Sequence, residues 1–143
     1  MFTVSQTIPL TFFSKVLIMI SQKILLVDDE ITLTELISEG LKMEGEFDVM
    51  QACNGKEALE KYKQYLPDLV VMDIEMPVMD GYESSSRIKS FDPNAKILVL
   101  TGNPTDVRVR KTVLEGIALT VLEKPVRLRD LNNTILRNLP ACA

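Results

Sequence analysis

The chain has 143 residues, of which 46% are hydrophobic and 25% charged, which is enough apolar material for one core and one domain. Its net charge of -4 and its scattered Lys and Arg residues argue against direct nucleic-acid binding, which needs a clustered basic patch. The absence of histidine, with two cysteines (Cys53 and Cys142) in no metal-ligand spacing, argues against a zinc or haem site and favours free thiols in a reducing cytoplasm.

The first 22 residues form an apolar extension ahead of the predicted domain. Pro9, Ser14 and Lys15 interrupt its apolar residues, which leaves far fewer than the roughly 20 that a membrane-spanning helix needs. No basic residue precedes the apolar run and no small-residue cleavage site follows it, so a signal peptide fits poorly as well. Two interpretations stay open: Met19 is the natural first residue, or residues 1–22 are an ordered extension packed on the domain or on a neighbour.

From Lys23 onward, short apolar runs alternate with segments of helical periodicity. The runs are KILLV, FDVMQA, LVVM, KILVL and ALTVL. Such alternation is typical of a parallel sheet with helices on both faces. The sequence therefore predicts an α/β fold with a doubly wound, five-stranded parallel sheet and five helices.

Apolar spacing predicts which faces of three helices are buried. The predicted faces are Leu33, Leu36, Ile37 and Leu41 in the first helix, Ala58, Leu59, Tyr62 and Leu66 in the second, and Leu128, Leu131, Ile135 and Leu139 in the fifth.

Capping residues indicate where helices begin. Asn54 with Glu57, and Asp80 with Glu83, have the spacing of capping boxes at the second and third helices. The Asn103-Pro104 pair predicts the start of the fourth helix, because proline is favoured in a first helical turn.

Polar side chains follow the apolar runs where strands are predicted to end. All strands of a parallel sheet point their carboxyl ends to one edge, and ligands bind in the crevice outside it. The residues placed there are Asp28, Asp29, Glu30, Asp73, Thr101, Glu123, Lys124 and Pro125. A buried Asp73 is tolerable at such an edge because Lys124 and a cation would compensate its charge.

The charges that converge at this edge indicate the chemistry. Asp28, Asp29 and Asp73 would repel one another, which favours a hard divalent cation with oxygen ligands, and Mg²⁺ suits a shallow carboxylate cleft. A carboxylate beside a metal ion, a lysine and a hydroxyl can attack phosphorus and carry the group as an aspartyl phosphate. We expect Lys124 and Thr101 to bind the phosphoryl oxygens.

The same residues carry a resemblance to a known family. VDDE at residues 27–30, MDIEMPVMDG at 72–81, Thr101 with Gly102, and EKP at 123–125 resemble the receiver domains of two-component response regulators, including chemotaxis receivers. The match runs in order through residues 23–140, which we take as the receiver domain. The family implies a flavodoxin-like strand order, 2-1-3-4-5.

The resemblance implies a role for each acidic residue. Asp73 would be the phosphorylated residue, and Asp28 and Asp29 the acidic pair that holds Mg²⁺ with it. The backbone carbonyl of Glu75 would be a further ligand of the metal.

The resemblance also implies roles for residues at the ends of the neighbouring strands. Thr101 would follow the phosphoryl group, Lys124 would be its counter-charge, and the bond between Lys124 and Pro125 is usually cis in relatives. Receivers commonly carry Tyr or Phe three residues before that lysine, where this chain has Val121. A valine has no ring to relocate, so the response to phosphorylation is expected to pass through Thr101 and the loop after it.

The resemblance also indicates partners. Since the chain has no histidine, a sensor histidine kinase or a histidine phosphotransfer protein must supply the phosphoryl group. The domain would catalyse its own phosphorylation and slow dephosphorylation without being a turnover enzyme. The end of the sequence soon after the fifth helix favours a free-standing relay over a piece of a longer regulator. An effector protein or a second copy would bind the fourth helix, last strand and fifth helix, a surface expected to carry Arg108, Arg110, Lys111 and Arg129.

Two readings from other classes stay open. A phosphohydrolase of the haloacid dehalogenase type also uses a strand-end Asp and Mg²⁺, but it carries a second Asp two residues later, where this chain has Glu75. A receiver-like scaffold would bind partners without being phosphorylated, and the intact set of Asp28, Asp29, Asp73 and Lys124 counts against it.

Overall fold

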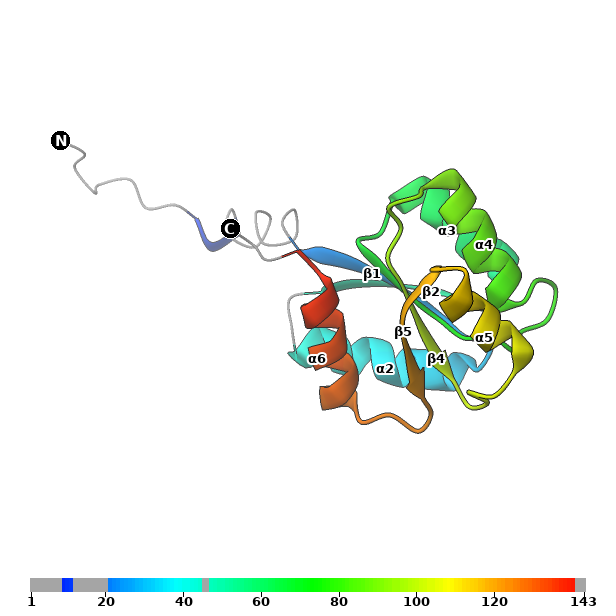
Figure 1. The fold of residues 1–143 in the computed structure, drawn as a ribbon. Coiled ribbons are helices and arrows are strands. Elements are labelled where there is room, and N and C mark those ends of the chain that lie inside the picture. The colour runs from blue at the N-terminus through cyan, green and yellow to red at the C-terminus, as the bar shows by residue number, and fades with distance from the viewer. Residues whose placement is uncertain (1–8, 12–20, 45–46, 141–143) are drawn as a thin grey trace.

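The computed structural model describes residues 9–11, 21–44 and 47–140, so most of the predicted extension and Cys142 lie outside the described residues. Within them, strands and helices alternate along the chain (Figure 1). The elements are β1 (Gln22–Val27), α2 (Ile31–Glu44), β2 (Phe47–Ala52), α3 (Gly55–Tyr65), β3 (Leu69–Met72), α4 (Gly81–Phe91), β4 (Ile97–Thr101), α5 (Val107–Leu114), β5 (Ala118–Glu123) and α6 (Leu128–Asn138). Among the helices described, none has the length and apolar character needed to cross a membrane.

The five strands form one parallel sheet in the order β2-β1-β3-β4-β5, which confirms the predicted fold and strand order. The register decides which residues meet at its carboxyl edge. Val27 of β1 lies opposite Met72 of β3, so Asp28 and Asp73 follow paired residues. Thr101 of β4 lies opposite Glu123 of β5, which places Lys124 beside the end of β4.

Both faces of the sheet are covered, which is why its central strands are continuous apolar runs. Ile24, Leu26 and Leu98 pack with α2 and α6 on one face, and Leu25 and Ile97 pack with α3 and α4 on the other. Alternate side chains of each strand thus enter different cores. A third, smaller cluster of Ile74, Val99 and Val109 packs β4 against α5. Figure 1 shows α2 and α6 below the sheet, α3 and α4 above it, and α5 at the right of the view.

The predicted buried face of α2 is partly wrong. Leu41 is buried and Ile37 packs against the core, but Leu36 is 64% exposed. Thr34 and Ser38 are buried instead. The Thr34 hydroxyl donates to the Ile31 carbonyl at 2.8 Å, so this short polar side chain can be buried with its hydrogen bond made inside the helix.

The second helix ends earlier than its apolar pattern suggests. Leu66 adopts the left-handed conformation as the C-cap of α3 and is exposed, although it was predicted to be buried. One of the two hydrogen bonds of the predicted capping box at the start of α3 is confirmed, because Asn54 accepts the Glu57 N–H at 2.8 Å. The other is not formed, because the Glu57 carboxylate accepts from the Cys53 N–H and not from the N–H of Asn54. The predicted face of α6 is confirmed, with Leu131 and Ile135 fully buried.

The start of α5 is also corrected. The helix begins at Val107 with Asp106 as its cap, and not at the Asn103-Pro104 pair. The Asn103 side chain accepts a hydrogen bond from the Thr105 hydroxyl at 3.1 Å, so it serves the loop. Asp106 accepts the Arg108 N–H at 2.8 Å and so fixes the first helical turn.

Candidate functional site

Three carboxylates meet at the carboxyl edge of the sheet, where the sequence predicted them. Asp28, Asp29 and Asp73 each offer an oxygen, and these oxygens lie within 4.8 Å of one another. Asp28 and Asp73 are only 4% and 7% exposed, whereas Asp29 is exposed. A cluster with two buried acids and one open side is accessible to a cation from solvent.

The backbone around Asp73 is held firmly. Its N–H donates to the Val27 carbonyl at 2.9 Å, and its carboxylate Oδ1 accepts the Ile74 N–H at 2.8 Å. The chain then folds back, so that the Gly81 N–H donates to the Ile74 carbonyl at 2.9 Å. A Cβ on Gly81 would lie 1.9 Å from the Asp73 carbonyl oxygen, so only glycine fits this return.

Lys124 reaches into the cluster from the end of β5. Its Nζ lies 2.5 Å from Asp28 Oδ2 and 3.7 Å from Asp73 Oδ2. Its own N–H donates to the Thr101 carbonyl at 2.8 Å, which fixes the residue against the end of β4. The bond between Lys124 and Pro125 is cis, as expected.

The electrostatics of the cluster show an excess of negative charge. Burial and the neighbouring charge of Asp28 raise the pKa of Asp73 to about 6, although Lys124 and the Ile74 N–H act in the opposite direction. Burial lowers the pKa of Lys124, but its hydrogen bond to Asp28 and the charge of Asp73 outweigh this, so its pKa is raised overall. Lys124 therefore stays protonated while Asp73 is a poorly stabilised anion.

This raised pKa predicts how stability depends on pH in metal-free protein. Because the folded pKa of Asp73 lies above its unfolded value of about 3.9, protonation favours the folded state. Relative to Asp73→Asn, the wild type should be most stable below about pH 4 and should lose about 1–2 kcal/mol as the pH rises through 6. Urea unfolding followed by circular dichroism from pH 4 to pH 8 measures this difference. A difference that does not change with pH would contradict the assignment.

Two further predicted site residues, Thr101 and Glu75, have side chains that bond to neighbours other than Asp73. Thr101 is 1% exposed, and its hydroxyl accepts the Asn103 N–H at 3.1 Å, so it lies at the end of β4 without a hydrogen bond to Asp73. The side chain of Glu75 is directed toward Arg108, with Oε1 and Nη2 3.8 Å apart.

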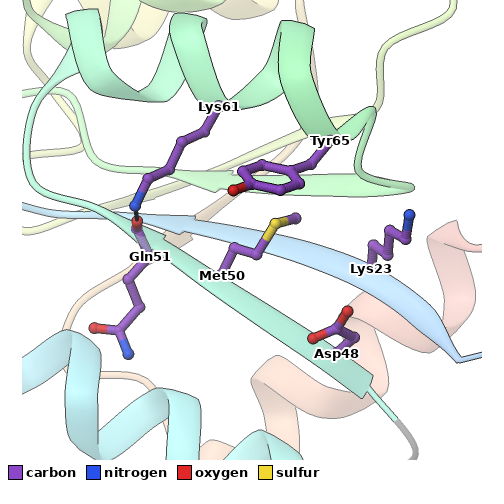
Figure 2. A pocket seen from close by; sticks show the side chains of 6 residues that line it. All are labelled: Lys23, Asp48, Met50, Gln51, Lys61 and Tyr65. Atoms are coloured by element: carbon purple, nitrogen blue, oxygen red, sulfur yellow. Dashed lines mark hydrogen bonds between the residues drawn. The ribbon is translucent and has the colours of Figure 1, made fainter. Parts of the chain in front are cut away.

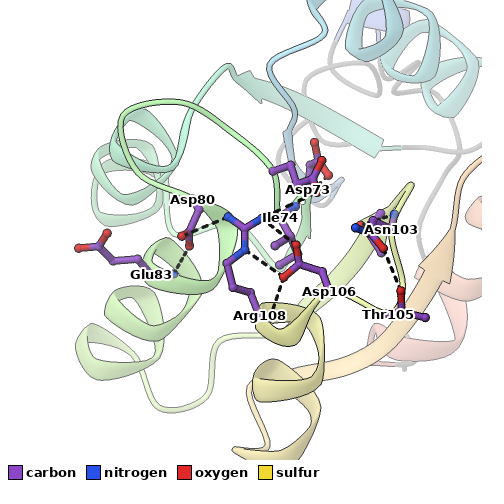
Figure 3. Close-up of polar contacts among 10 residues, drawn as sticks. Asp73, Ile74, Asp80, Glu83, Asn103, Thr105, Asp106 and Arg108 are labelled. Atoms are coloured by element: carbon purple, nitrogen blue, oxygen red, sulfur yellow. Dashed lines mark hydrogen bonds and ion pairs between the residues drawn. The ribbon is translucent and has the colours of Figure 1, made fainter.

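Arg108 was predicted as part of a partner surface, and the structure shows that its guanidinium is also engaged with acidic side chains beside the site. Figure 3 shows its guanidinium among carboxylates next to the loop that follows Asp73. It pairs with Asp106 at 2.8 Å, Asp80 at 3.5 Å and Glu75 at 3.8 Å. Its charge is therefore engaged beside the site. The sequence signal that could have found it is Asp106, a helix cap two residues before the arginine.

A hollow of about 340 Å³ lies between α3 and the strands β1 and β2 rather than at the acidic cluster (Figure 2). Lys23, Asp48, Met50, Gln51, Lys61 and Tyr65 line it. Lys61 donates to the Gln51 carbonyl, so a lysine covers an outward-facing backbone acceptor of this strand. Lysines at such positions protect an edge strand against pairing with another chain, and we interpret the role of Lys61 beside this hollow as this protection.

Comparison with known proteins agrees with this geometry. Residues 24–136 match the family model of the response regulator receiver domain. The chain is 44% identical over 97 residues to the chemotaxis protein CheY of Halobacterium salinarum, which covers 67% of this chain and 79% of that protein. It is 33% identical over 122 residues to the sporulation initiation phosphotransferase F of Bacillus subtilis, which covers 85% and 97%.

A solved structure extends the likeness to three dimensions. The response regulator protein TrrA of Thermotoga maritima, in complex with Mg²⁺ and BeF, superposes with a TM-score of 0.72 at 34% identity, covering 82% of this chain and 99% of that one. The family match spans most of the chain and includes the whole acidic cluster with Lys124. The chain therefore belongs to the response regulator receiver domains of two-component signalling.

Proposed function

We propose that this domain accepts a phosphoryl group from a partner phosphohistidine on the carboxylate of Asp73. The observation that carries the proposal is the convergence of three carboxylates within 4.8 Å, with the Lys124 ammonium 3.7 Å from Asp73. This arrangement combines a destabilised anionic nucleophile with a fixed positive charge, which is what attack on phosphorus needs. We take residues 23–140 as the unit that does this chemistry.

The donor set fits Mg²⁺. Carboxylate oxygens of Asp28, Asp29 and Asp73 are hard ligands, and a cation would offset the burial and the repulsion from Asp28 that raise the pKa of Asp73. We propose the backbone carbonyl of Glu75 as a further ligand. When bound, Mg²⁺ would supply charge neutralisation for the incoming phosphoryl oxygens.

The residues of this chain have separate roles in the transfer. The Ile74 N–H holds Asp73 Oδ1, which leaves Oδ2 on the Lys124 side to form the new O–P bond. The N–P bond of the donor breaks, and the histidine nitrogen keeps its electron pair. Lys124, which is hydrogen-bonded to Asp28, would then donate to a phosphoryl oxygen, and the Thr101 hydroxyl would donate to another. The domain thus catalyses its own modification, and slow hydrolysis of the product resets it.

The partner surface that we propose comprises α5, β5 and α6. A hollow of about 320 Å³ is lined by Pro104, Val109, Arg110, Val113, Leu114 and Val121. Of these lining residues, Val113 and Leu114 are exposed apolar side chains, which suits contact with an effector protein or a second copy. Val121 is partly buried and packs with Ile74 and Val109, so it connects this surface to the strand-end loops.

The phosphoryl donor and the compartment complete the proposal. A sensor histidine kinase or a histidine phosphotransfer protein would supply the group, and the name of the Bacillus relative, a phosphotransferase, supports phosphoryl transfer as the activity. Cys53 is a free and exposed thiol, which agrees with a reducing cytoplasm.

Incubation with acetyl phosphate and Mg²⁺, followed by intact-mass spectrometry and a phosphate-release assay, tests the function. We expect one phosphoryl group per chain, lost when Mg²⁺ is withheld. Rapid release of phosphate without an adduct would instead favour a phosphohydrolase, and no reaction at all would favour an unphosphorylated scaffold.

A further inference from the structure

One arginine lies between the caps of two helices that flank the site. Asp80 caps α4, because its Oδ1 accepts the Glu83 N–H at 2.8 Å. Asp106 caps α5 in the same way with the Arg108 N–H at 2.8 Å. Each cap turns its second oxygen to the Arg108 guanidinium, at 3.5 Å from Asp80 Oδ2 and 2.8 Å from Asp106 Oδ2 (Figure 3).

The pairing with Asp106 is the firm part of this arrangement. Arg108 Nε donates to Oδ1 at 3.0 Å and Nη2 to Oδ2 at 2.8 Å, so the contact is bidentate. These hydrogen bonds hold the pKa of Asp106 at about 2. The guanidinium is thereby fixed in orientation, and its remaining edge reaches across to the loop of residues 73–80, where it meets Asp80 and Glu75.

This bridge joins the two loops that surround the site. The loop of residues 73–80 carries Asp73, and the segment of residues 101–106 carries Thr101 and leads into α5. Across the described ranges of the chain, every ion pair between these two segments or their helices is made by Arg108. The other polar contacts between α4 and α5 lie further along the helices, where Tyr82 donates to Glu115 and Lys111 lies over the Tyr82 ring.

Glu75 is the acidic partner whose position matters most for chemistry. It lies two residues after Asp73, and its side chain is 59% exposed. A carboxylate free to move at this position could accept a proton from water attacking an aspartyl phosphate, as a general base. Arg108 draws it toward α5 instead.

We propose that Arg108 is a positioning residue for the phosphoryl chemistry, which links the loop after Asp73 to the start of α5 and holds the Glu75 carboxylate away from the phosphorylated site. The proposal rests on the proposed function for its kinetic consequence, although the structural link can be tested without phosphorylation. Exposed ion pairs contribute up to about 1 kcal/mol, so a shift of about two- to fivefold in rate is the expected scale.

The kinetic test follows the half-life of the phosphoryl adduct in Arg108→Ala, Arg108→Lys and Arg108→Ala combined with Glu75→Gln. We expect Arg108→Ala to shorten the half-life about two- to fivefold, and Arg108→Lys to shorten it less because it keeps one charge. In the Glu75→Gln background, Arg108→Ala should have no further effect, because no carboxylate is left to release. Isothermal titration calorimetry should show an unaltered Mg²⁺ affinity.

A second measurement uses the metal-free protein. Amide chemical shifts of Arg108→Ala should change both at residues 75–79 and at residues 103–107, since the link is broken on both sides. The matched control is Arg87→Ala, which removes an arginine from an exposed pair with Glu83 on α4 and should leave both segments unchanged.

The outcomes separate the two proposals. If the wild type forms no adduct, the proposed function fails, and the chemical shifts alone decide whether Arg108 links the loops. If the adduct forms but its half-life is the same in Arg108→Ala, or if the shortening persists undiminished with Glu75→Gln, the positioning role is wrong. Unchanged amides at residues 75–79 would overturn the link itself.

Discussion

Replacing Asp73 with asparagine should abolish the phosphoryl adduct, with a loss of at least about 100-fold in the rate of its formation. The side-chain amide has the same shape and can still accept the Ile74 N–H through its oxygen, so the loop should keep its conformation. It lacks the anionic oxygen that attacks phosphorus. Intact-mass spectrometry after incubation with acetyl phosphate and Mg²⁺ measures the loss.

The matched control for this variant is Asp48→Asn on the exposed side of β2, which makes the same chemical change far from the acidic cluster. It should take up phosphate at the wild-type rate. An adduct that forms equally fast in Asp73→Asn would show that another side chain is the acceptor and would remove the basis of the assignment.

Replacing Gly81 with alanine should be the most disruptive single-methyl change near the site. The new Cβ would lie 1.9 Å from the Asp73 carbonyl oxygen and 2.9 Å from the Ile74 Cα, and neither backbone atom can move aside alone. We expect a loss of about 3 kcal/mol in the free energy of unfolding, together with slower phosphorylation because Asp73 itself is displaced.

Gly102→Ala provides the control, since a Cβ there meets nothing within 4 Å. It should change the free energy of unfolding by less than about 0.5 kcal/mol. Chemical denaturation followed by circular dichroism compares the two variants. Equal denaturation midpoints would mean that the close return of the chain at Gly81 is not a constraint on the fold.

The sheet and the acidic cluster were predictable because both depend on short-range sequence signals. Buried strands of a parallel sheet are continuous apolar runs, and LVVM followed by Asp73 is unambiguous in this respect. Once the strands are parallel, their polar ends must meet, so Asp28 and Asp73 come together without further information.

Features that depend on how neighbouring elements pack were harder to predict from the sequence. Leu36 and Leu66 fit a helical period, yet the buried face of α2 is rotated toward Thr34 and Ser38, and α3 ends before Leu66. The bridge of Arg108 depends on residues from two loops whose mutual placement follows only from the packing of α4 against α5. Asp106, two residues before Arg108, indicates one of its partners, but nothing in the sequence indicates that Asp80 and Glu75 also lie beside the arginine.

The meeting of the three carboxylates would couple the proposed cation binding to folding. Asp28 and Asp73 are 45 positions apart in the chain and are brought within 4.8 Å only when β1 and β3 pair, so the unfolded chain offers no comparable site. By mass action, an ion that binds only the folded state stabilises it by about 2.7 kcal/mol at one hundred times its dissociation constant. If the proposed Mg²⁺ site is correct, the burial and mutual repulsion that weaken the metal-free fold would also make the stability of the domain depend on the free concentration of divalent cation.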